Sequence, residues 1–289
     1  MPAPIRLSRP TLAADGPLAQ IPKKIWTYWN QAQLDPFVQQ CVQSWHHQCP
    51  GHEIIVVGPH NVRQHVAPED LPGQFDQLHP TKQSDWLRLY LVARHGGYWF
   101  DATTLLTAPL DWMTPAGSCE LAGFYLQGFT SDERFPVIES WAFCAPAGSR
   151  FVSQWQQEFH QALITEGTAP YLQRLQSRPD AADILQRIPD PAYLLIHVAA
   201  QQVMRRLGDA QLELFKAEDT AFFYHAALRW KWYLLYPQLC LAKAPAVAAP
   251  IIKLRGGERR HFTDMMALHG PAAPGSIWHQ ALHQRPAGV

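Results

Sequence analysis

Residues 84–103 read S-D-W-L-R-L-Y-L-V-A-R-H-G-G-Y-W-F-D-A-T, and this stretch decides the fold. Its first half predicts a helix, because apolar residues recur there at helical spacing. The apolar stripe of this helix consists of Trp86, Leu87, Tyr90 and Leu91. Gly96-Gly97 would end the helix, with the first glycine in a left-handed C-cap, and Tyr98-Trp99-Phe100 predicts a short inner strand. A carboxylate, Asp101, therefore falls at the carboxyl end of a buried strand.

The residues before this stretch predict alternating strands and helices. A run rich in β-formers at 21–29 predicts a strand that is buried on both faces, and the apolar residues after Pro36 predict a helix. Residues 53–58 (E-I-I-V-V-G) predict a second buried strand, and 59–66 the start of another helix. This alternation indicates an α/β fold with a mainly parallel central sheet and flanking helices. Such sheets bind ligands beyond the carboxyl ends of their strands, where Asp101 is expected.

The remainder of the chain is less regular. Beyond residue 110 the pattern predicts strands and helices before a proline-broken connector at 242–250. The strands are expected at 121–129 and 139–144, and the helices at 151–163 and 193–206. Residues 1–20, with four prolines and no periodicity, are interpreted as a flexible lead-in, so that structure begins at Ile21. The length of the chain fits one large domain or two small ones.

Composition narrows the class of protein. The 289 residues are 47% hydrophobic, and 24 basic residues balance 24 acidic ones, so no overall field would attract nucleic acid. The five cysteines are scattered and form no C-x-x-C pair, which favours a reducing cytoplasm over a disulfide framework or a zinc knuckle. Neither a secretory signal nor a run of about 18 apolar residues is evident. We therefore expect a cytoplasmic protein that is at most peripheral to a membrane.

Asp85 and Arg88 allow two interpretations. They lie three residues apart in the predicted helix, on a different face from the apolar stripe, and Ser84 would cap the start of that helix. One interpretation is a surface ion pair worth a few tenths of a kcal/mol. The other is a ligand-binding pair, because the helix leads directly to Asp101 at the edge of the sheet.

The same stretch resembles S-D-x-x-R followed by G-G-x-x-x-D-x-D/T, a signature of nucleotide-sugar glycosyltransferases that include initiating α-mannosyltransferases and large glucosylating toxins. The chain is most similar to the capsular polysaccharide synthesis family, in which G-G-x-W-x-D-A-T matches residues 96–103. Further landmarks occur in order at 21–29, 44–45, 138–141 and 250–254. The resemblance implies a single GT-A-like domain over residues 21–289, with a nucleotide-binding half at about 21–110. The second half, 111–289, would bind the acceptor and carry a closing C-terminal loop.

The resemblance also implies roles for single residues. Trp29 would stack on the base or lie at its edge, and Ser84 and Asp85 would contact the ribose or the donor sugar. Arg88 would contact the sugar or the pyrophosphate, and Asp101 matches the first acid of D-x-D. Asp85, Arg88 and Asp101 are thus the predicted catalytic residues.

A metal ion is implied by the same motif. Asp101 and Thr103 would hold Mn²⁺ or Mg²⁺ against the donor diphosphate. Thr103 replaces the second acid of D-x-D, as is usual in this family, and a hydroxyl holds such an ion less tightly than a carboxylate. Alternatively, Asp101 accepts a sugar hydroxyl while fixed Arg and Lys donors neutralise the diphosphate. Trp99, which stands where the toxins carry a tyrosine, is assigned to the nucleotide-sugar site.

Five further residues have two interpretations each. Ser276 and Trp278 are similar to a loop that closes over the phosphates in the toxins, or they belong to an ordinary loop with a buried tryptophan. Lys253 is either a counter-charge for phosphate or a solvated lysine. Glu139 is a contact to the donor or acceptor sugar, or a structural carboxylate. His197 matches a recurrent family histidine, although a core histidine is the first expectation.

The expected function is transfer of a hexose from a UDP- or GDP-sugar to a saccharide or lipid-linked saccharide, with retention of configuration, in synthesis of a capsular or other surface polysaccharide. One alternative is a protein of the same fold that binds a nucleotide sugar or glycan without turnover. Another is a peripheral assembly protein of a polysaccharide machine. In that case the basic and aromatic residues at 229–233 would contact the inner face of the membrane.

Overall fold

The computed structural model describes residues 4–7, 20–115 and 119–284. The strands are β1 Ile5–Leu7, β2 Lys24–Tyr28, β3 Glu53–Val57, β4 Gly97–Phe100, β5 Thr104–Leu106, β6 Leu121–Tyr125, β7 Ile138–Ala145, β8 Leu212–Lys216 and β9 Ile251–Lys253. The α-helices are α1 Pro36–Gln48, α2 Val62–His65, α3 Pro80–His95, α4 Arg150–His160, α5 Thr168–Gln176, α6 Ala181–Leu185, α7 Leu195–Leu207, α8 Phe223–Ala227, α9 Gly256–His269 and α10 Ile277–His283. A π-helical turn, Gln161–Thr165, continues α4.

Across the part of the chain with assigned structure, seven strands form a central sheet in the order β1-β8-β6-β7-β4-β2-β3. Five of the seven point the same way: β3, β2 and β4 are parallel to one another, and β6 and β8 share their direction. Strand β7 and the edge strand β1 run in the opposite direction. The predicted α/β fold with a mainly parallel central sheet and flanking helices is confirmed.

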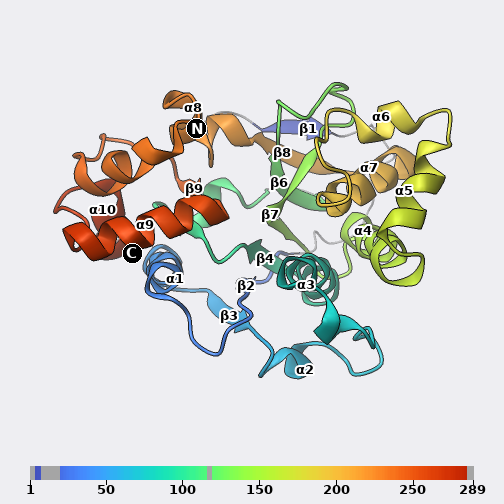
Figure 1. Ribbon diagram of the computed structural model, residues 1–289, viewed down its shortest axis with the longest axis horizontal. Coiled ribbons are helices and arrows are strands. Elements are labelled where there is room, and N and C mark those ends of the chain that lie inside the picture. Colours follow the sequence, from blue (N-terminus) through green and yellow to red (C-terminus); the bar gives the residue numbers. More distant parts are fainter. Residues whose placement is uncertain (1–3, 8–19, 116–118, 285–289) are drawn as a thin grey trace.

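The sheet separates two apolar cores, because side chains alternate across each strand. In β2, Trp26 faces the first core and Ile25 the second, and in β4, Trp99 faces the first core while Phe100 faces the second. Helices α3, α4 and α7 cover one side in Figure 1, and α1, α9 and α10 lie on the other side. A second, two-stranded sheet of β5 and β9 belongs to the side of α1.

The turn between α3 and β4 requires glycine. Gly96 has φ +67° and ψ −174°, and Gly97 has φ +101°. A Cβ at Gly96 would lie 2.6 Å from the backbone nitrogen of Ala147, and one at Gly97 would lie 2.6 Å from the carbonyl oxygen of Lys24. The predicted helix stop is confirmed, but the predicted left-handed cap is wrong, because ψ is extended in a region that essentially only glycine occupies.

The start of α3 also differs from the prediction. The helix begins at Pro80, and the His79 side chain accepts a hydrogen bond from the Thr81 amide. Ser84 is therefore one turn inside the helix and does not cap it. This position leaves its hydroxyl available to a neighbouring side chain.

Three expectations about strands need correction. Strand β3 is a half-exposed edge strand and is not buried on both faces, because it pairs only with β2. Residues 5–7 of the predicted lead-in form a strand that pairs with β8, whereas residues 8–19 lie outside the described residues. The strand predicted to end at 129 ends at Tyr125.

Two further features bear on the expected compartment. The five cysteines all carry free thiols. Across residues 4–7, 20–115 and 119–284, no helix is both long and apolar enough to cross a bilayer.

Candidate active site

A cavity of about 930 Å³ opens at the edge of the sheet where the parallel strands have their carboxyl ends. Trp29 follows β2 and Asp101 follows β4, and both line the cavity. Glu139 and Ser140, near the start of β7, line it too. Because β7 is antiparallel to β4, its amino end lies at the same edge. A volume of this size is typical of sites for small molecules and cofactors.

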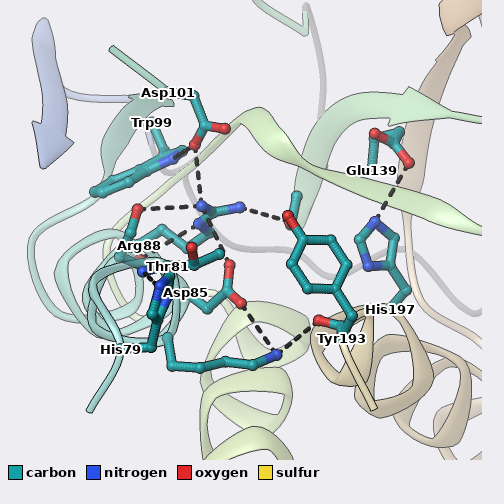
Figure 2. Close-up of polar contacts among 12 residues, drawn as sticks. His79, Thr81, Asp85, Arg88, Trp99, Asp101, Glu139, Tyr193 and His197 are labelled. Atoms are coloured by element: carbon teal, nitrogen blue, oxygen red, sulfur yellow. Dashed lines mark hydrogen bonds and ion pairs between the residues drawn. The ribbon is translucent and has the colours of Figure 1, made fainter. Parts of the chain in front are cut away.

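Arg88 is the centre of the polar wall and joins two carboxylates (Figure 2). Its Nη2 lies 3.2 Å from Asp85 Oδ1 and 3.0 Å from Asp101 Oδ1. Its Nη1 donates to Ser140 Oγ at 2.6 Å, and its Nη2 donates to Ser84 Oγ at 3.2 Å. Asp85 and Arg88 are both buried. The interpretation as an exposed surface ion pair is therefore wrong, and Ser140 is a partner that sequence reasoning did not find.

Asp101 accepts hydrogen bonds at both carboxylate oxygens. Trp99 Nε1 and Arg88 Nη2 donate to Oδ1 at 3.2 and 3.0 Å, and Lys253 Nζ donates to Oδ2 at 2.9 Å. Burial by itself would raise the pKa of Asp101, but Arg88 and Lys253 outweigh it and hold the pKa below its ordinary value. The side chain remains 25% exposed to the cavity, so an ionised carboxylate is presented to a ligand.

Trp99 lies behind this carboxylate and not on the cavity wall. It is fully buried, and the Arg88 guanidinium lies 5.3 Å from the centre of its ring. A direct contact between Trp99 and a nucleotide sugar is not possible in this arrangement. The residue acts instead on Asp101 and Arg88, whose positions it fixes.

Lys253 comes from the second sheet. Residue Thr104 of β5 pairs with Lys253 of β9, which brings Lys253 Nζ to 3.0 Å from Thr103 Oγ1. The Thr103 hydroxyl donates to the Leu254 carbonyl oxygen at 2.6 Å. The interpretation of Lys253 as a solvated lysine is wrong, since it is buried against Asp101 and Thr103.

The predicted metal site does not fit these side chains. A divalent cation of this class binds several oxygen ligands, and carboxylates dominate its shell. Here the Lys253 ammonium group lies between Asp101 and Thr103, and both Asp101 oxygens already accept from cationic groups. Within the residues that the structure describes, no three His, Cys, Asp or Glu side chains are grouped to hold a metal ion.

The end of β9 and the segment after it supply cationic side chains to the same cavity. Lys253, Arg255 and Arg259, here called the basic arc, all line it. The Arg259 guanidinium lies 5.1 Å from the centre of a Trp29 ring and pairs with Asp35 at 2.7 Å. The sign of this arc in the sequence is the run K-L-R-G-G-E-R-R at 253–260, in which the resemblance implies a site role for Lys253 alone.

Arg255 is held by a buried carboxylate. Glu258 accepts from the Arg255 side chain at 2.7 Å and lies 3.0 Å from His225 Nε2. Burial by itself would raise the pKa of Glu258, but hydrogen bonds from His225 and Arg255 lower it to about 2. The glutamate is therefore ionised at neutral pH and fixes one end of the basic arc.

Glu139 and His197 form a second polar pair on the cavity wall. Glu139 Oε1 lies 3.3 Å from His197 Nε2 (Figure 2), and both side chains line the cavity. His197 Nδ1 has no hydrogen-bond partner among the described residues. The histidine expected in the core is thus a cavity residue, and Glu139 is placed where it can contact a sugar.

The structure does not bring Ser276 and Trp278 to the cavity. Both are fully buried. Ser276 caps α10 by accepting from the His279 amide at 3.2 Å, and Trp278 Nε1 donates to Gln40 Oε1 at 2.6 Å. The burial expected for the tryptophan is confirmed, but the expected loop is wrong, because Trp278 lies in α10 and Ser276 is the N-cap of that helix.

Two exposed aromatic rings border the cavity, Trp230 and Tyr193. Trp230 follows Arg229 with φ +59° after φ +53°, so two successive residues other than glycine occupy the left-handed region, at a cost of about 1 kcal/mol or more each. A hydrogen bond from the Trp230 amide to the His225 carbonyl at 2.7 Å holds this conformation. Strain retained at a cavity mouth is typical of functional positions.

Comparison with known proteins gives a family and distant structural neighbours. The sequence model of a family described as capsular polysaccharide synthesis protein matches residues 15–168, just over half of the chain. No curated protein matches the chain.

Among solved structures, the chain is similar to the PaToxG glycosyltransferase at 9% identity and a TM-score of 0.39, covering 93% of this chain and 88% of that one. It is similar to the glycosyltransferase GlyE of Streptococcus pneumoniae TIGR4 at 10% identity and a TM-score of 0.41, covering 84% and 60%. A third is the galactosyltransferase LgtC in complex with donor and acceptor sugar analogs, at 12% identity and a TM-score of 0.39, covering 87% and 98%. Scores this low support no conclusion about activity.

Proposed function

We propose that this chain, which belongs to the capsular polysaccharide synthesis protein family, is a glycosyltransferase that moves a sugar from a nucleotide sugar to a saccharide. The observation that carries the proposal is the setting of Asp101. It is an ionised, partly exposed carboxylate at the carboxyl end of β4, between Arg88 and Lys253, in a cavity large enough for a nucleotide sugar. Ligands of open α/β sheets bind at this edge.

The donor would lie across the polar wall and the basic arc. Carboxylate oxygens of Asp85 and Asp101 can accept from sugar or ribose hydroxyls, because a carboxylate has about four lone-pair sites and Asp101 uses three, for Arg88, Lys253 and Trp99. The Ser84 hydroxyl lies beside them. Trp29 offers a ring to the base, on the side of the basic arc. A UDP- or GDP-hexose has the chemistry that these groups would bind.

The proposed reaction forms one bond and breaks one. The oxygen of an acceptor hydroxyl bonds to C1 of the sugar while the bond from C1 to the diphosphate oxygen breaks. The electron pair leaves with the nucleoside diphosphate, and the hydroxyl proton passes to a phosphate oxygen. We propose retention of configuration, from the resemblance of the sequence, and a role in capsular or other surface polysaccharide. The free thiols of all five cysteines support a reducing compartment, so we propose the cytoplasm as the location.

The test of this proposal is a panel of UDP- and GDP-sugars incubated with the full chain. We expect at least one of them to raise the melting temperature and to be hydrolysed slowly to the nucleoside diphosphate without an acceptor. Added saccharide acceptors should speed the release of the nucleotide, and NMR of the product would report the anomeric configuration. A chain that neither binds nor hydrolyses any member of the panel would contradict the proposal.

The acceptor is expected to stack on Trp230. Its ring is 42% exposed at the cavity mouth, and its backbone is held in one strained conformation. Trp230→Ala should therefore raise the KM for the saccharide acceptor roughly tenfold, about 1.4 kcal/mol, with a smaller change in the rate of donor hydrolysis.

Trp232 supplies a matched control, because it is similarly exposed at 46% but does not line this cavity. Trp232→Ala should leave the acceptor KM unchanged. If instead both substitutions abolish binding to anionic liposomes and neither changes the KM, residues 229–233 form a membrane contact.

A further inference from the structure

We infer that the basic arc of Lys253, Arg255 and Arg259 neutralises the donor diphosphate in place of a divalent cation, so that sugar transfer by this chain needs no metal ion. The inference rests on the proposed function and names how the site holds the charged half of its donor.

The side-chain oxygens of Asp101 and Thr103, which would hold a metal ion, already form hydrogen bonds within the chain. Lys253 Nζ lies 2.9 Å from Asp101 Oδ2 and 3.0 Å from Thr103 Oγ1, so its ammonium group bridges the two side chains expected to hold the ion. The other oxygen of Asp101 accepts from Arg88, and the Thr103 hydroxyl donates its proton to a carbonyl. An ammonium group thus occupies the point between carboxylate and hydroxyl that a cation would take.

Lys253 is fixed in its position between Asp101 and Thr103. Its backbone is in the ladder between β5 and β9, with the Lys253 amide donating to the Ala221 carbonyl at 3.2 Å and the Leu254 amide donating to the Thr103 carbonyl at 3.0 Å. The lysine side chain is only 10% exposed. A divalent ion between Asp101 and Thr103 would therefore meet a buried ammonium group that cannot retreat into water, and like charges in such a place repel strongly.

The basic arc carries enough positive charge to replace a divalent ion. A single ammonium group carries half the charge of a divalent ion, and two more cations line the same cavity. Each guanidinium has five N–H donors, and the carboxylates that hold Arg255 and Arg259 use only some of them. Both arginines also stay partly exposed, so they can donate to phosphate oxygens, for which the planar guanidinium is well suited.

The basic arc supplies what the reaction requires at its leaving group. As the bond from C1 to the diphosphate breaks, the electron pair moves onto a phosphate oxygen, and fixed cations beside that oxygen stabilise the developing charge. The acceptor oxygen replaces the phosphate oxygen at C1, and its proton leaves on the phosphate. The balance of atoms and charge is complete without a metal ion.

Two measurements test the inference on the full chain after treatment with EDTA. The first is a calorimetric titration with MnCl₂ alone, in which we expect no stoichiometric binding. The second is binding of UDP and GDP and hydrolysis of their sugars, with EDTA or with added Mn²⁺ and Mg²⁺. We expect affinities and rates in the two conditions to agree within about threefold.

Substitutions of Lys253 make the test specific. Lys253→Met should weaken binding of the nucleoside diphosphate about tenfold or more with or without metal, because one fixed cation is lost. Lys253→Glu should turn the site into a metal site, because a second carboxylate beside Asp101 gives a divalent ion its ligands. Binding of the nucleoside diphosphate should then depend on Mn²⁺. Lys216→Met is the matched control, because Lys216 pairs with Asp219 outside the cavity, and it should bind nucleotide as the unsubstituted chain does.

The outcomes separate this inference from the proposed function. Two results would overturn the inference without contradicting the proposed glycosyltransferase function. One is stoichiometric binding of Mn²⁺ to the unsubstituted chain, and the other is loss of donor binding in EDTA that Mn²⁺ restores. Unchanged nucleotide binding in Lys253→Met, with melting intact, would also overturn it. Absence of binding to every nucleotide and nucleotide sugar in either condition would overturn both.

Discussion

Asp101→Asn is expected to lower the rate of sugar transfer by about 100- to 1,000-fold, the usual cost of removing one fixed electrostatic group from an active site. The amide has nearly the same shape as the carboxylate but no charge. Its –NH₂ group must face either Arg88 or Lys253, both of which donate at 3.0 and 2.9 Å. One of these cations then loses one of its acceptors and moves, so both the sugar contact and the basic arc are disturbed.

The fold should survive Asp101→Asn, because its backbone is held independently of the side chain. The Asp101 amide donates to the Trp141 carbonyl at 2.8 Å, and the Thr104 amide donates to the Asp101 carbonyl at 3.0 Å. A melting curve and a circular dichroism spectrum would check this, and steady-state rates with the preferred nucleotide sugar would measure the loss.

Asp132→Asn is the matched control for this substitution. Asp132 is 24% exposed, almost as Asp101 is at 25%, and it too lies between two arginines, Arg134 and Arg205, but outside the cavity. Its transfer rate should stay within about twofold of the unsubstituted chain. Equal rates for Asp101→Asn and Asp132→Asn would remove Asp101 from the chemistry. A chain that binds nucleotide sugars without turnover, with or without the substitution, would be the binding protein of the alternative hypothesis.

The part of the site that the sequence could predict is the part built from neighbouring residues. Helix α3, the diglycine and β4 follow one another directly, so their periodicity and turn residues are sufficient to place Asp101 at the end of a strand. The prediction of Asp85 and Arg88 on one helix face needed only their spacing. Burial of that face did not follow from spacing, because it depends on β7, whose Ser140 accepts from Arg88 across 52 residues of sequence.

Sequence patterns could not predict the contacts between segments that are distant in the chain. Lys253 reaches Asp101 across 152 residues, through a two-stranded sheet whose strands are three residues long. Strands so short have no recognisable alternation. For the same reason, the sequence did not predict roles for Arg255 and Arg259, because the residues around them resemble an ordinary helix start. A motif with one acid and one hydroxyl likewise gives no sign that an ammonium group lies between them.

Arg88→Met is expected to destabilise the folded chain by about 3–5 kcal/mol, the cost of removing one partner from a buried ion pair. The Arg88 side chain is 5% exposed and compensates both Asp85 and Asp101. Methionine fills a similar volume but removes a cation from the buried Asp85, which retains only Lys82 at 3.7 Å, and from the partly exposed Asp101, which retains Lys253. Chemical denaturation at neutral pH would measure the loss in free energy of unfolding.

The pH dependence of this loss identifies its cause. Without Arg88, burial should raise the pKa of Asp101 above its present lowered value, since the largest favourable charge is gone. If that pKa rises above its value in the unfolded chain, protonation stabilises the folded state. The loss in free energy of unfolding caused by Arg88→Met should then shrink as the pH falls from 7 toward the raised pKa.

Adding Asp85→Asn to Arg88→Met should restore roughly 1 kcal/mol or more of the free energy of unfolding, because one uncompensated charge is removed. Arg63→Met, which breaks an exposed pair with Asp76, should cost less than about 1 kcal/mol at every pH. Equal losses for Arg88→Met and Arg63→Met would mean that the cluster around Arg88 does not support the fold.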